Sequence, residues 1–271
     1  IVEGHREVNR ALMSKYDIKE IFICFHYTNN EILKLVKNKN IIINECSKKV
    51  FDKISYRQNP DGVIGIFKTF FKNLNQIEIK SDSTFVVIEN IEKPGNLGNI
   101  IRTSDAVNAS GIIILNKKTD IYNPNVIRSS IGSLFSIPII NTDNDTFFKW
   151  ARKNKVESYA TSPFADKNYT DAIYNKSIAI IFGSEDDGLT KEVINLSDQE
   201  ISIPMLGLND SLNVSSSVSI ILYEILRQRN KLKVWLMKEF NTHKVIEINH
   251  SKTGVFELIL ERNELHFDPG D

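Results

Sequence analysis

Cysteine and histidine are too few and too scattered in this sequence to indicate a metal site. The chain has two cysteines, Cys24 and Cys46, and neither belongs to a C-x-x-C pair. Its five histidines have no metal-ligand spacing. Unpaired cysteines are typical of a reducing compartment. We therefore expect a cytoplasmic protein with no structural or catalytic metal.

Long apolar runs and a net charge are also absent. No run approaches the roughly 18 residues that a membrane span requires, and the first residues do not look like a signal peptide. We therefore expect no membrane association. The 34 basic and 34 acidic residues cancel, so no global positive field indicates a nucleic-acid binder. A neutral total can hide a local basic patch, so the charge neither supports nor excludes RNA.

Two common nucleotide-binding motifs are missing. No G-x-G-x-x-G follows the first strand-like segment, and no Gly-Lys-Ser or Gly-Lys-Thr occurs. These absences exclude a dinucleotide fingerprint and a P-loop. What is present is an ordinary globular composition: 271 residues, of which 41% are hydrophobic and 25% charged. Such a chain should bury a sizeable core.

Residues 1–80 have the pattern of a small α/β domain. Helix-like pieces alternate with strand-like pieces; the helices are expected at residues 5–15, 30–37 and 47–54, and the strands at 21–25, 41–43 and 62–67. The polar stretch 71–83 is predicted to connect this domain to the next one.

Residues 81–229 repeat a strand-then-helix order. Apolar strands are expected at 84–88, 111–115, 137–140, 156–161, 177–182 and 200–203, and helices at 99–108, 125–130, 145–154 and 212–229. This order predicts a mostly parallel sheet with helices on both faces. Residues 230–271 form an extension with an apolar, basic piece at 232–238 and strand-like segments at 244–249 and 254–260. The sequence indicates no chemistry there.

The first polar motif is Asn96-x-Gly98-x-x-x-Arg102, which follows the strand at residues 84–88. We expect a turn at Gly98 and then a helix, with Arg102 in its early turns and facing the carboxyl end of the sheet. An arginine beside a helix N-terminus suits a phosphate or a carboxylate. The alternative is a surface or interdomain salt bridge.

The second motif, Gly183-x-Glu185-x-x-Gly188, also follows an apolar strand. Strand ends of open α/β sheets are natural ligand sites; Gly183 would let a backbone approach closely, and Glu185 would supply an acceptor. Alternatively, the acidic residues favour the N-terminus of a following helix.

The third motif runs from Ile203-Pro204-Met205 through Ser211-Leu212-Asn213 into the last helix of the domain. Ser211 could cap that helix without any function. Asn213, which we place inside the first helical turn, is less easily explained in that way. The loop at residues 205–208 suits either an adenine ring or burial in the core.

Together, the three motifs resemble those of the SpoU/TrmH family of RNA ribose 2′-O-methyltransferases in order, composition and spacing. The resemblance covers residues 2–229 and includes matches at 102–106, 129–138 and 161–163. It implies a SPOUT-superfamily α/β fold whose C-terminal part is threaded into a deep trefoil knot, an exception to the rule that chains avoid knots. It also implies a homodimer formed through this domain, with S-adenosyl-L-methionine (AdoMet) as the methyl donor bound by the knotted loops.

The resemblance also implies roles for individual residues. Those implied to contact AdoMet are Gly183, Ile203, Met205 and Leu212, with Thr161 near the adenosine end. Those implied to form the polar catalytic cluster are Asn96, Arg102, Glu185, Ser211 and Asn213. A guanidinium stays protonated over the accessible pH range, so we expect Arg102 to bind the nucleotide phosphate and stabilise the developing alkoxide. The identity of the general base stays open.

Residues 1–80 look like the ribosomal-protein-like RNA-binding domain of many members that modify ribosomal RNA; a scaffold or dimer-stabilising domain is the alternative. The resulting hypothesis is methyl transfer from AdoMet to a ribose 2′-hydroxyl of ribosomal RNA. The alternatives are the same chemistry on tRNA and a non-catalytic AdoMet- or RNA-binding protein. The presence of all five implied catalytic residues argues against the non-catalytic alternative.

Overall fold

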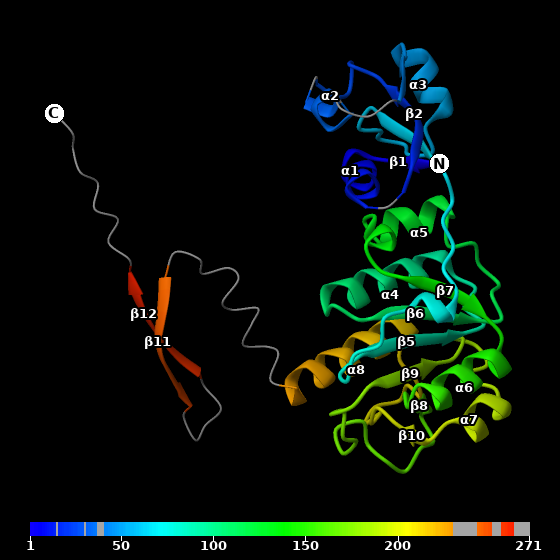
Figure 1. The fold of residues 1–271 in the computed structure, drawn as a ribbon, viewed down its shortest axis with the longest axis vertical. Helices are drawn as coiled ribbons and strands as arrows, with labels where there is room; N and C mark the ends of the chain where they lie inside the picture. The colour runs from blue at the N-terminus through cyan, green and yellow to red at the C-terminus, as the bar shows by residue number, and fades with distance from the viewer. Residues whose placement is uncertain (15, 30, 37–40, 230–242, 251–255, 263–271) are drawn as a thin grey trace. The chain divides into compact units, whose positions relative to one another are not determined.

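The computed structural model describes residues 1–14, 16–29, 31–36, 41–229, 243–250 and 256–262. The chain divides into two compact units, Ile1–Glu224 and Ile225–Asp271. The first unit contains two sheets, one of four strands and one of six (Figure 1). No helix in the described ranges is both long enough and apolar enough to cross a membrane.

The N-terminal part of the first unit is a four-stranded sheet with three helices. Its strand order is β1-β4-β2-β3; β2 and β3 run parallel, whereas β4 is antiparallel to both of its neighbours. The elements are β1 (Val2–Glu3), α1 (His5–Met13), β2 (Ile18–Ile23), α2 (Glu31–Val36), β3 (Ile42–Glu45), α3 (Lys48–Ile54) and β4 (Val63–Phe67). The predicted alternation of helices and strands is confirmed, with β2 beginning three residues earlier than expected.

The larger sheet has the order β10-β8-β9-β5-β6-β7, and every neighbouring pair is parallel. This confirms the predicted parallel sheet. Its elements are β5 (Thr84–Glu89), α4 (Pro94–Ala106), β6 (Gly111–Leu115), α5 (Pro124–Ser129), the 3₁₀ turn η2 (Ser133–Phe135), β7 (Ile139–Thr142), α6 (Asn144–Lys153), β8 (Glu157–Thr161), β9 (Ile178–Phe182), α7 (Lys191–Leu196), β10 (Gln199–Ile201) and α8 (Val214–Gln228). The strand order does not test the knot that the resemblance implies, and the knot stays a prediction.

The central strands are buried along their whole length, which explains their unbroken apolar runs. All residues of β5, β6 and β9 are buried, as expected for parallel strands covered on both faces. On one face, α6 and α7 contribute Phe147, Trp150 and Val193 to a core cluster with alternate residues of these strands. Figure 1 shows α4 and α8 away from α6 and α7.

The stretch between the two sheets does more than connect them. It contains the 3₁₀ turn η1 (Leu74–Gln76). Leu74 is buried in the core of the larger sheet, and Ile77 and Ile79 pack against that core. Part of the segment predicted from its polarity to be a linker therefore belongs to the packing of the larger sheet.

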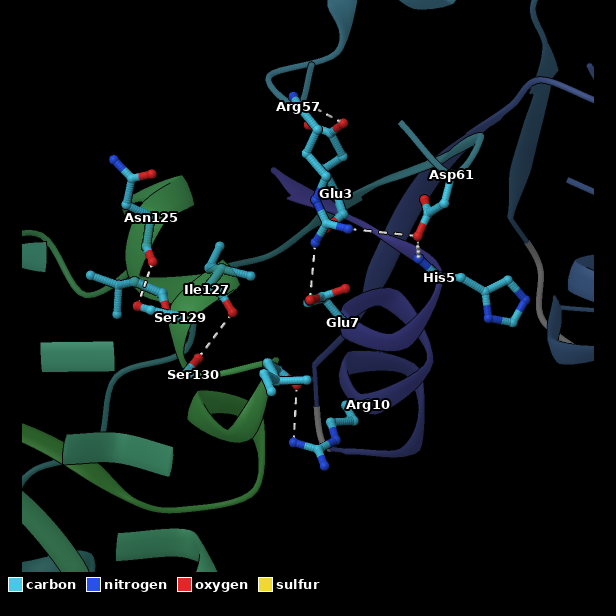
Figure 2. A network of polar contacts seen from close by, with 12 residues as sticks. Glu3, His5, Glu7, Arg10, Arg57, Asp61, Asn125, Ile127, Ser129 and Ser130 are labelled. Atoms are coloured by element: carbon cyan, nitrogen blue, oxygen red, sulfur yellow. Dashed lines mark hydrogen bonds and ion pairs between the residues drawn. The ribbon is translucent and has the colours of Figure 1, made fainter. Parts of the chain in front are cut away.

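Helix α1 packs on the segment that follows α5. The Arg10 guanidinium donates to the carbonyl oxygen of Ile131 at 3.0 Å and to Ser133 Oγ at 2.8 Å. Figure 2 shows Arg10 on α1 facing the green segment that follows Ser130. Gly132 has a φ of 75°, and a Cβ atom there would lie 3.1 Å from the Cα atom of Glu7. A glycine is needed at this position both for the positive φ and for the close approach of α1. The motif at residues 129–138 therefore docks the N-terminal sheet domain.

The second unit contains an antiparallel pair, β11 (His243–His250) and β12 (Phe256–Arg262). This confirms the two strands expected after residue 240. The apolar, basic piece predicted at residues 232–238 and the turn between the strands lie outside the described residues.

Candidate active site

The three sequence motifs meet at the carboxyl edge of the larger sheet. Strands β10, β8, β9 and β5 are neighbours and parallel, so the loops that follow them lie on one edge. At this edge Thr161, the last residue of β8, donates from Oγ1 to the carbonyl oxygen of Ile181 at 2.9 Å. The placement expected from the strand ends is confirmed.

The loop after β9 folds back on itself and is fixed to β5. Ser184 and Gly188 exchange two backbone hydrogen bonds of 3.1 and 3.2 Å. A Cβ atom at Gly183 would overlap the backbone of Gly188. The backbone that approaches Gly183 closely, as predicted, is therefore the protein's own backbone at Gly188. Glu89, fully buried at the end of β5, accepts from the backbone N–H of Thr190 at 2.9 Å and from its Oγ1 at 2.8 Å.

Helix α4 begins earlier than the sequence analysis predicted. It starts at Pro94, a residue favoured in the first turn because it lacks the N–H that would go unpaired there. Gly98 thus lies within the helix and not in a turn, so that prediction was wrong. A Cβ atom at Gly98 would overlap Ser129 Oγ and lie 2.8 Å from the carbonyl oxygen of Val126. The glycine allows α4 and α5 to pack closely.

Three of the predicted polar residues form one hydrogen-bonded group, which we call the polar cluster: Asn96, Glu185 and Asn213. The Glu185 carboxylate accepts from the side-chain amides of Asn96 and of Asn213, the latter at 2.6 Å. Asn213 Nδ2 also lies 3.3 Å from Asn96 Oδ1. The cluster joins the first turn of α4 and the loop after β9 to the start of α8.

Lys93 is a fourth partner that the sequence analysis missed. Its ammonium donates to Glu185. This hydrogen bond, together with the attraction to the carboxylate, raises the pKa of Lys93. The residue precedes Pro94, and the helix-start signal at that proline could have drawn attention to it.

The start of α8 corrects the roles considered for Ser211 and Asn213. Asn213 lies immediately before the helix, and its Oδ1 accepts from the backbone N–H of Ser215 at 3.0 Å. Asn213 is therefore the residue that caps α8. Ser211 is exposed, and its hydroxyl lies 3.5 Å from Asp210. The alternative in which Ser211 caps the helix is wrong.

Arg102 lies in the third turn of α4 and is exposed. Within the described part of the chain its side chain makes no hydrogen bond or ion pair, and it does not join the polar cluster. We expected the positive end of the helix dipole to help Arg102 bind an anion. That attraction fades after the first turn of a helix, so it does not reach Arg102. Any anion at Arg102 must be bound by the guanidinium itself.

A cavity of about 390 Å³ opens beside the polar cluster. All five residues implied to contact AdoMet line it: Thr161, Gly183, Ile203, Met205 and Leu212. Glu185 and Ser211 line it as well. Asn96, Arg102 and Asn213 are not among its lining residues. Near the cavity, Leu206 and Leu208 are almost fully exposed, so the alternative that placed the whole 205–208 loop in the core is wrong.

Comparisons with known proteins match both sheet domains to known families. Residues 83–223 match the SpoU rRNA Methylase family, and residues 1–71 match the RNA 2′-O ribose methyltransferase substrate binding family. A 23S rRNA (uridine(2479)-2′-O)-methyltransferase of Streptomyces viridochromogenes is 29% identical over 205 residues, which are 73% of this chain and 71% of the relative.

Two solved structures show the same architecture. The SpoU methyltransferase AviRb from Streptomyces viridochromogenes matches with a TM-score of 0.77 and 25% identity, over 84% of this chain and 89% of its own. The AdoMet-bound rRNA methyltransferase of Sinorhizobium meliloti matches with a TM-score of 0.76 and 31% identity, over 83% of this chain and 85% of its own.

The fold and these matches define an RNA 2′-O-ribose methyltransferase that uses AdoMet as its methyl donor. The chain belongs to the SpoU rRNA methylase family.

The cavity fits AdoMet in size and chemistry. Its volume lies within the range of about 300–1,000 Å³ that is usual for small-molecule sites. Ile203, Met205 and Leu212 offer apolar surface for the adenine ring. Three carboxylates, those of Asp186, Asp187 and Asp210, also line the cavity, and their negative charge complements the positive charges of the sulfonium and amino groups.

Proposed function

We propose that this chain methylates the ribose 2′-hydroxyl of a nucleotide in ribosomal RNA. The observation that carries the proposal is the polar cluster of Asn96, Glu185 and Asn213 at the side of the cavity that fits AdoMet. The match of residues 1–71 to a substrate-binding family and the 23S rRNA enzyme among the relatives favour ribosomal RNA over tRNA.

In this proposal the polar cluster positions the reacting ribose. AdoMet, when bound, supplies a methyl group on a positively charged sulfonium. The protein then has to align the hydroxyl with that methyl group and assist the loss of its proton. Asn96 and Asn213 each offer amide groups beside Glu185, which fixes their orientation. Ser211 lines the cavity close to this cluster and can contact the ribose.

Arg102 is proposed to bind the phosphate of the target nucleotide and to stabilise the developing alkoxide. Its guanidinium is exposed and makes no ion pair with the residues that the structure describes, so its donors are available. A permanently protonated guanidinium is a poor base. In this scheme the bound phosphate assists proton removal.

The test of the function uses radiolabelled AdoMet with unmodified ribosomal RNA and, separately, with unmodified tRNA. Label in ribosomal RNA, mapped to one ribose and absent with Arg102→Ala, supports the proposal. Label only in tRNA would show that tRNA, and not ribosomal RNA, is the substrate. Binding of AdoMet without any label in either RNA or in assembled ribosomal particles would contradict methyl transfer to RNA by this chain.

The role of Arg102 makes a separate prediction for Arg102→Lys. The lysine keeps the charge but loses the planar fork of donors. We expect methyl transfer to fall by about 10²-fold or more, while the Kd for AdoMet stays unchanged because Arg102 does not line the cavity. Calorimetric titration with AdoMet and single-turnover methylation measure the two quantities. Equal losses in both would exclude this role.

We further propose that the chain acts as a homodimer through residues 81–229. The support is apolar exposure: Leu206 and Leu208 are almost fully exposed, and Tyr223 on α8 is about half exposed. Contiguous exposed apolar surface marks association sites, and Leu206 and Leu208 lie two residues apart on one loop. Sedimentation of the full chain measures the oligomeric state.

The domain limits and the compartment stay proposals as well. Residues 1–80 are proposed to bind the RNA substrate, residues 81–229 to transfer the methyl group, and residues 230–271 to form an extension. A ribosomal RNA substrate in a cell without a nucleus would place the protein in the cytoplasm.

A further inference from the structure

We propose that a second cavity, at the junction of the two sheet domains, binds an unpaired nucleotide of the RNA substrate within about seven positions of the methylated one. The inference rests on the proposed function. This junction cavity has a volume of about 610 Å³ and shares no lining residue with the AdoMet cavity. Its walls come from the end of α1, the segment after β4, the end of α4 and the residues around η2.

Aromatic rings form one side of the junction cavity. Tyr16 packs edge-on against Phe70 and Phe135, with ring centroids 6.0 and 4.9 Å apart. Phe135 is buried, whereas Phe70 is 42% exposed. Exposed rings of this kind stack with the bases of single-stranded RNA, and base specificity is not required for that contact.

The ring of Phe70 belongs to a segment that is fixed in place. The hydroxyl of Tyr122 donates to the carbonyl oxygen of Phe70 at 2.6 Å and accepts from its backbone N–H at 3.2 Å. The same hydroxyl lies 3.2 Å from that of Tyr16. A stacking surface held in this way loses little conformational entropy when a base binds.

Cationic and acceptor groups complete the junction cavity. Lys72 lines it and has no hydrogen bond or ion pair within the described ranges, so its ammonium is available to a phosphate. Arg10 also lines it; its Nη1 donates to Ile131 and Ser133, and within the described part of the chain its other guanidinium donors make no hydrogen bond, which leaves them for a phosphate. Asp105 supplies carboxylate oxygens, which can accept from the amino group of a base.

Helix α4 connects the junction cavity to the proposed catalytic residues. Asp105 follows Arg102 by three residues, so the two side chains share a face of the helix. Nine residues separate Asn96 from Asp105, which corresponds to about 13 Å along the helix axis and to half a turn around it, so the two side chains lie on opposite sides of α4. Stacked nucleotides advance by roughly 3.4 Å each. With a helix diameter of about 10–12 Å, the path along and around α4 is roughly 20–23 Å, so about six or seven stacked nucleotides would separate a target ribose at the polar cluster from a base in the junction cavity.

The test compares two adjacent phenylalanines in the full chain. Phe70 lines the junction cavity, whereas Phe71 is 57% exposed and does not line it. The probe is a short single-stranded RNA that carries 2-aminopurine, a fluorescent base whose emission falls when it stacks on an aromatic ring. We expect the unsubstituted chain and Phe71→Ala to quench it with the same Kd, and Phe70→Ala to raise the Kd by about 5-fold to 150-fold.

A matched pair of lysines tests the phosphate contact. Lys72→Ala is expected to weaken the binding of the same RNA and to reduce its dependence on salt. Lys68→Ala is the control, because Lys68 lies four residues away, pairs with Asp17 and does not line the junction cavity. The Kd for AdoMet, measured on every variant, reports intact folding.

Two results would overturn the inference: no quenching by the unsubstituted chain, or equal Kd values for Phe70→Ala and Phe71→Ala. Neither result bears on the proposed function, because these readouts require no methyl transfer. Conversely, quenching that depends on Phe70, in a chain that labels no RNA, would support the junction cavity and reject the proposed reaction.

Discussion

Gly98 shows how one missing side chain sets the geometry around the active site. Its Cα atom faces Ser129 and Val126 of α5, and the space that a Cβ atom would need is filled. Helix α4 carries both Asn96 and Arg102. A displacement of α4 from α5 would therefore move both residues relative to Glu185.

We predict that Gly98→Ala destabilises the fold by about 1–3 kcal/mol, because a backbone carbonyl on α5 would have to move. Gly95→Ala is the matched control on the same helix: a Cβ atom there meets nothing within 4 Å, and alanine is the better helix former. Urea unfolding measures both variants. Equal losses of stability in Gly98→Ala and Gly95→Ala would show that the close packing of α4 on α5 is not the cause.

The identities of the site residues were predictable to different degrees. Glu185, Asn96 and Asn213 could be singled out because polar residues at strand ends of a parallel sheet share one edge. Their mutual hydrogen bonds could not be predicted, since these depend on the side-chain positions of residues as far as 89 positions apart in the chain, such as Asn96 on α4 and Glu185 on the loop after β9. The partner Lys93 was missed for the same reason.

At the scale of elements, the apolar strands were the most predictable part of the fold. The strand at residues 111–115 coincides with β6, because a strand buried on both faces has an unbroken apolar run. Helix starts were less predictable. The start of α4 was placed five residues late because Gly98 was interpreted as a turn, although Pro94 marked the helix start.

The start of α6 makes a prediction about pH. Asp143 caps this helix, and hydrogen bonds from the backbone N–H and the hydroxyl of Thr146, each 2.8 Å long, lower the pKa of Asp143 below 3.8. A lowered folded-state pKa stabilises the protein above the unfolded value, and this contribution disappears as the pH falls through the folded value.

Asp143→Asn keeps a capping side chain but removes its charge. At neutral pH we therefore expect Asp143→Asn to have a lower urea midpoint than the unsubstituted chain. The difference between the two midpoints should disappear as the pH falls through 3.8 and below. Asp145→Asn is the control, because Asp145 lies in the same turn, accepts no capping bond and pairs only with exposed Lys149 among the described residues. A difference in urea midpoint that does not change with pH would show that the charge of Asp143 is not the cause.

At the scale of the whole molecule, the two sheet domains are joined through Ser133. This buried hydroxyl accepts from Arg10 of α1 at 2.8 Å and donates to Asp105 of α4 at 2.9 Å. The bridge thus links the proposed RNA-binding domain to the helix that carries Arg102. The segment around Ser133 could be singled out from the sequence, but its docking role became apparent only from the packing of α1.

We predict that Ser133→Ala destabilises the fold by about 1–3 kcal/mol and raises the KM for RNA while leaving the Kd for AdoMet unchanged. Ser130→Ala is the control: Ser130 is equally buried and does not line the junction cavity, and among the described residues its hydroxyl donates to the carbonyl oxygen of Ile127 at 3.0 Å and to neither Arg10 nor Asp105. Calorimetric unfolding and steady-state methylation measure both variants. Equal KM values for the two variants would show that the bridge does not position the RNA.

The polar cluster also determines when, during synthesis, the chain can begin to transfer a methyl group. Asn213 lies 117 residues after Asn96, its hydrogen-bond partner. Domains generally fold as units, the N-terminal one first, so the substrate-binding domain can fold while most of the larger sheet is still unmade. A nascent chain should therefore be able to engage RNA before it can methylate it, and chains that stop before α8 should retain only the first ability.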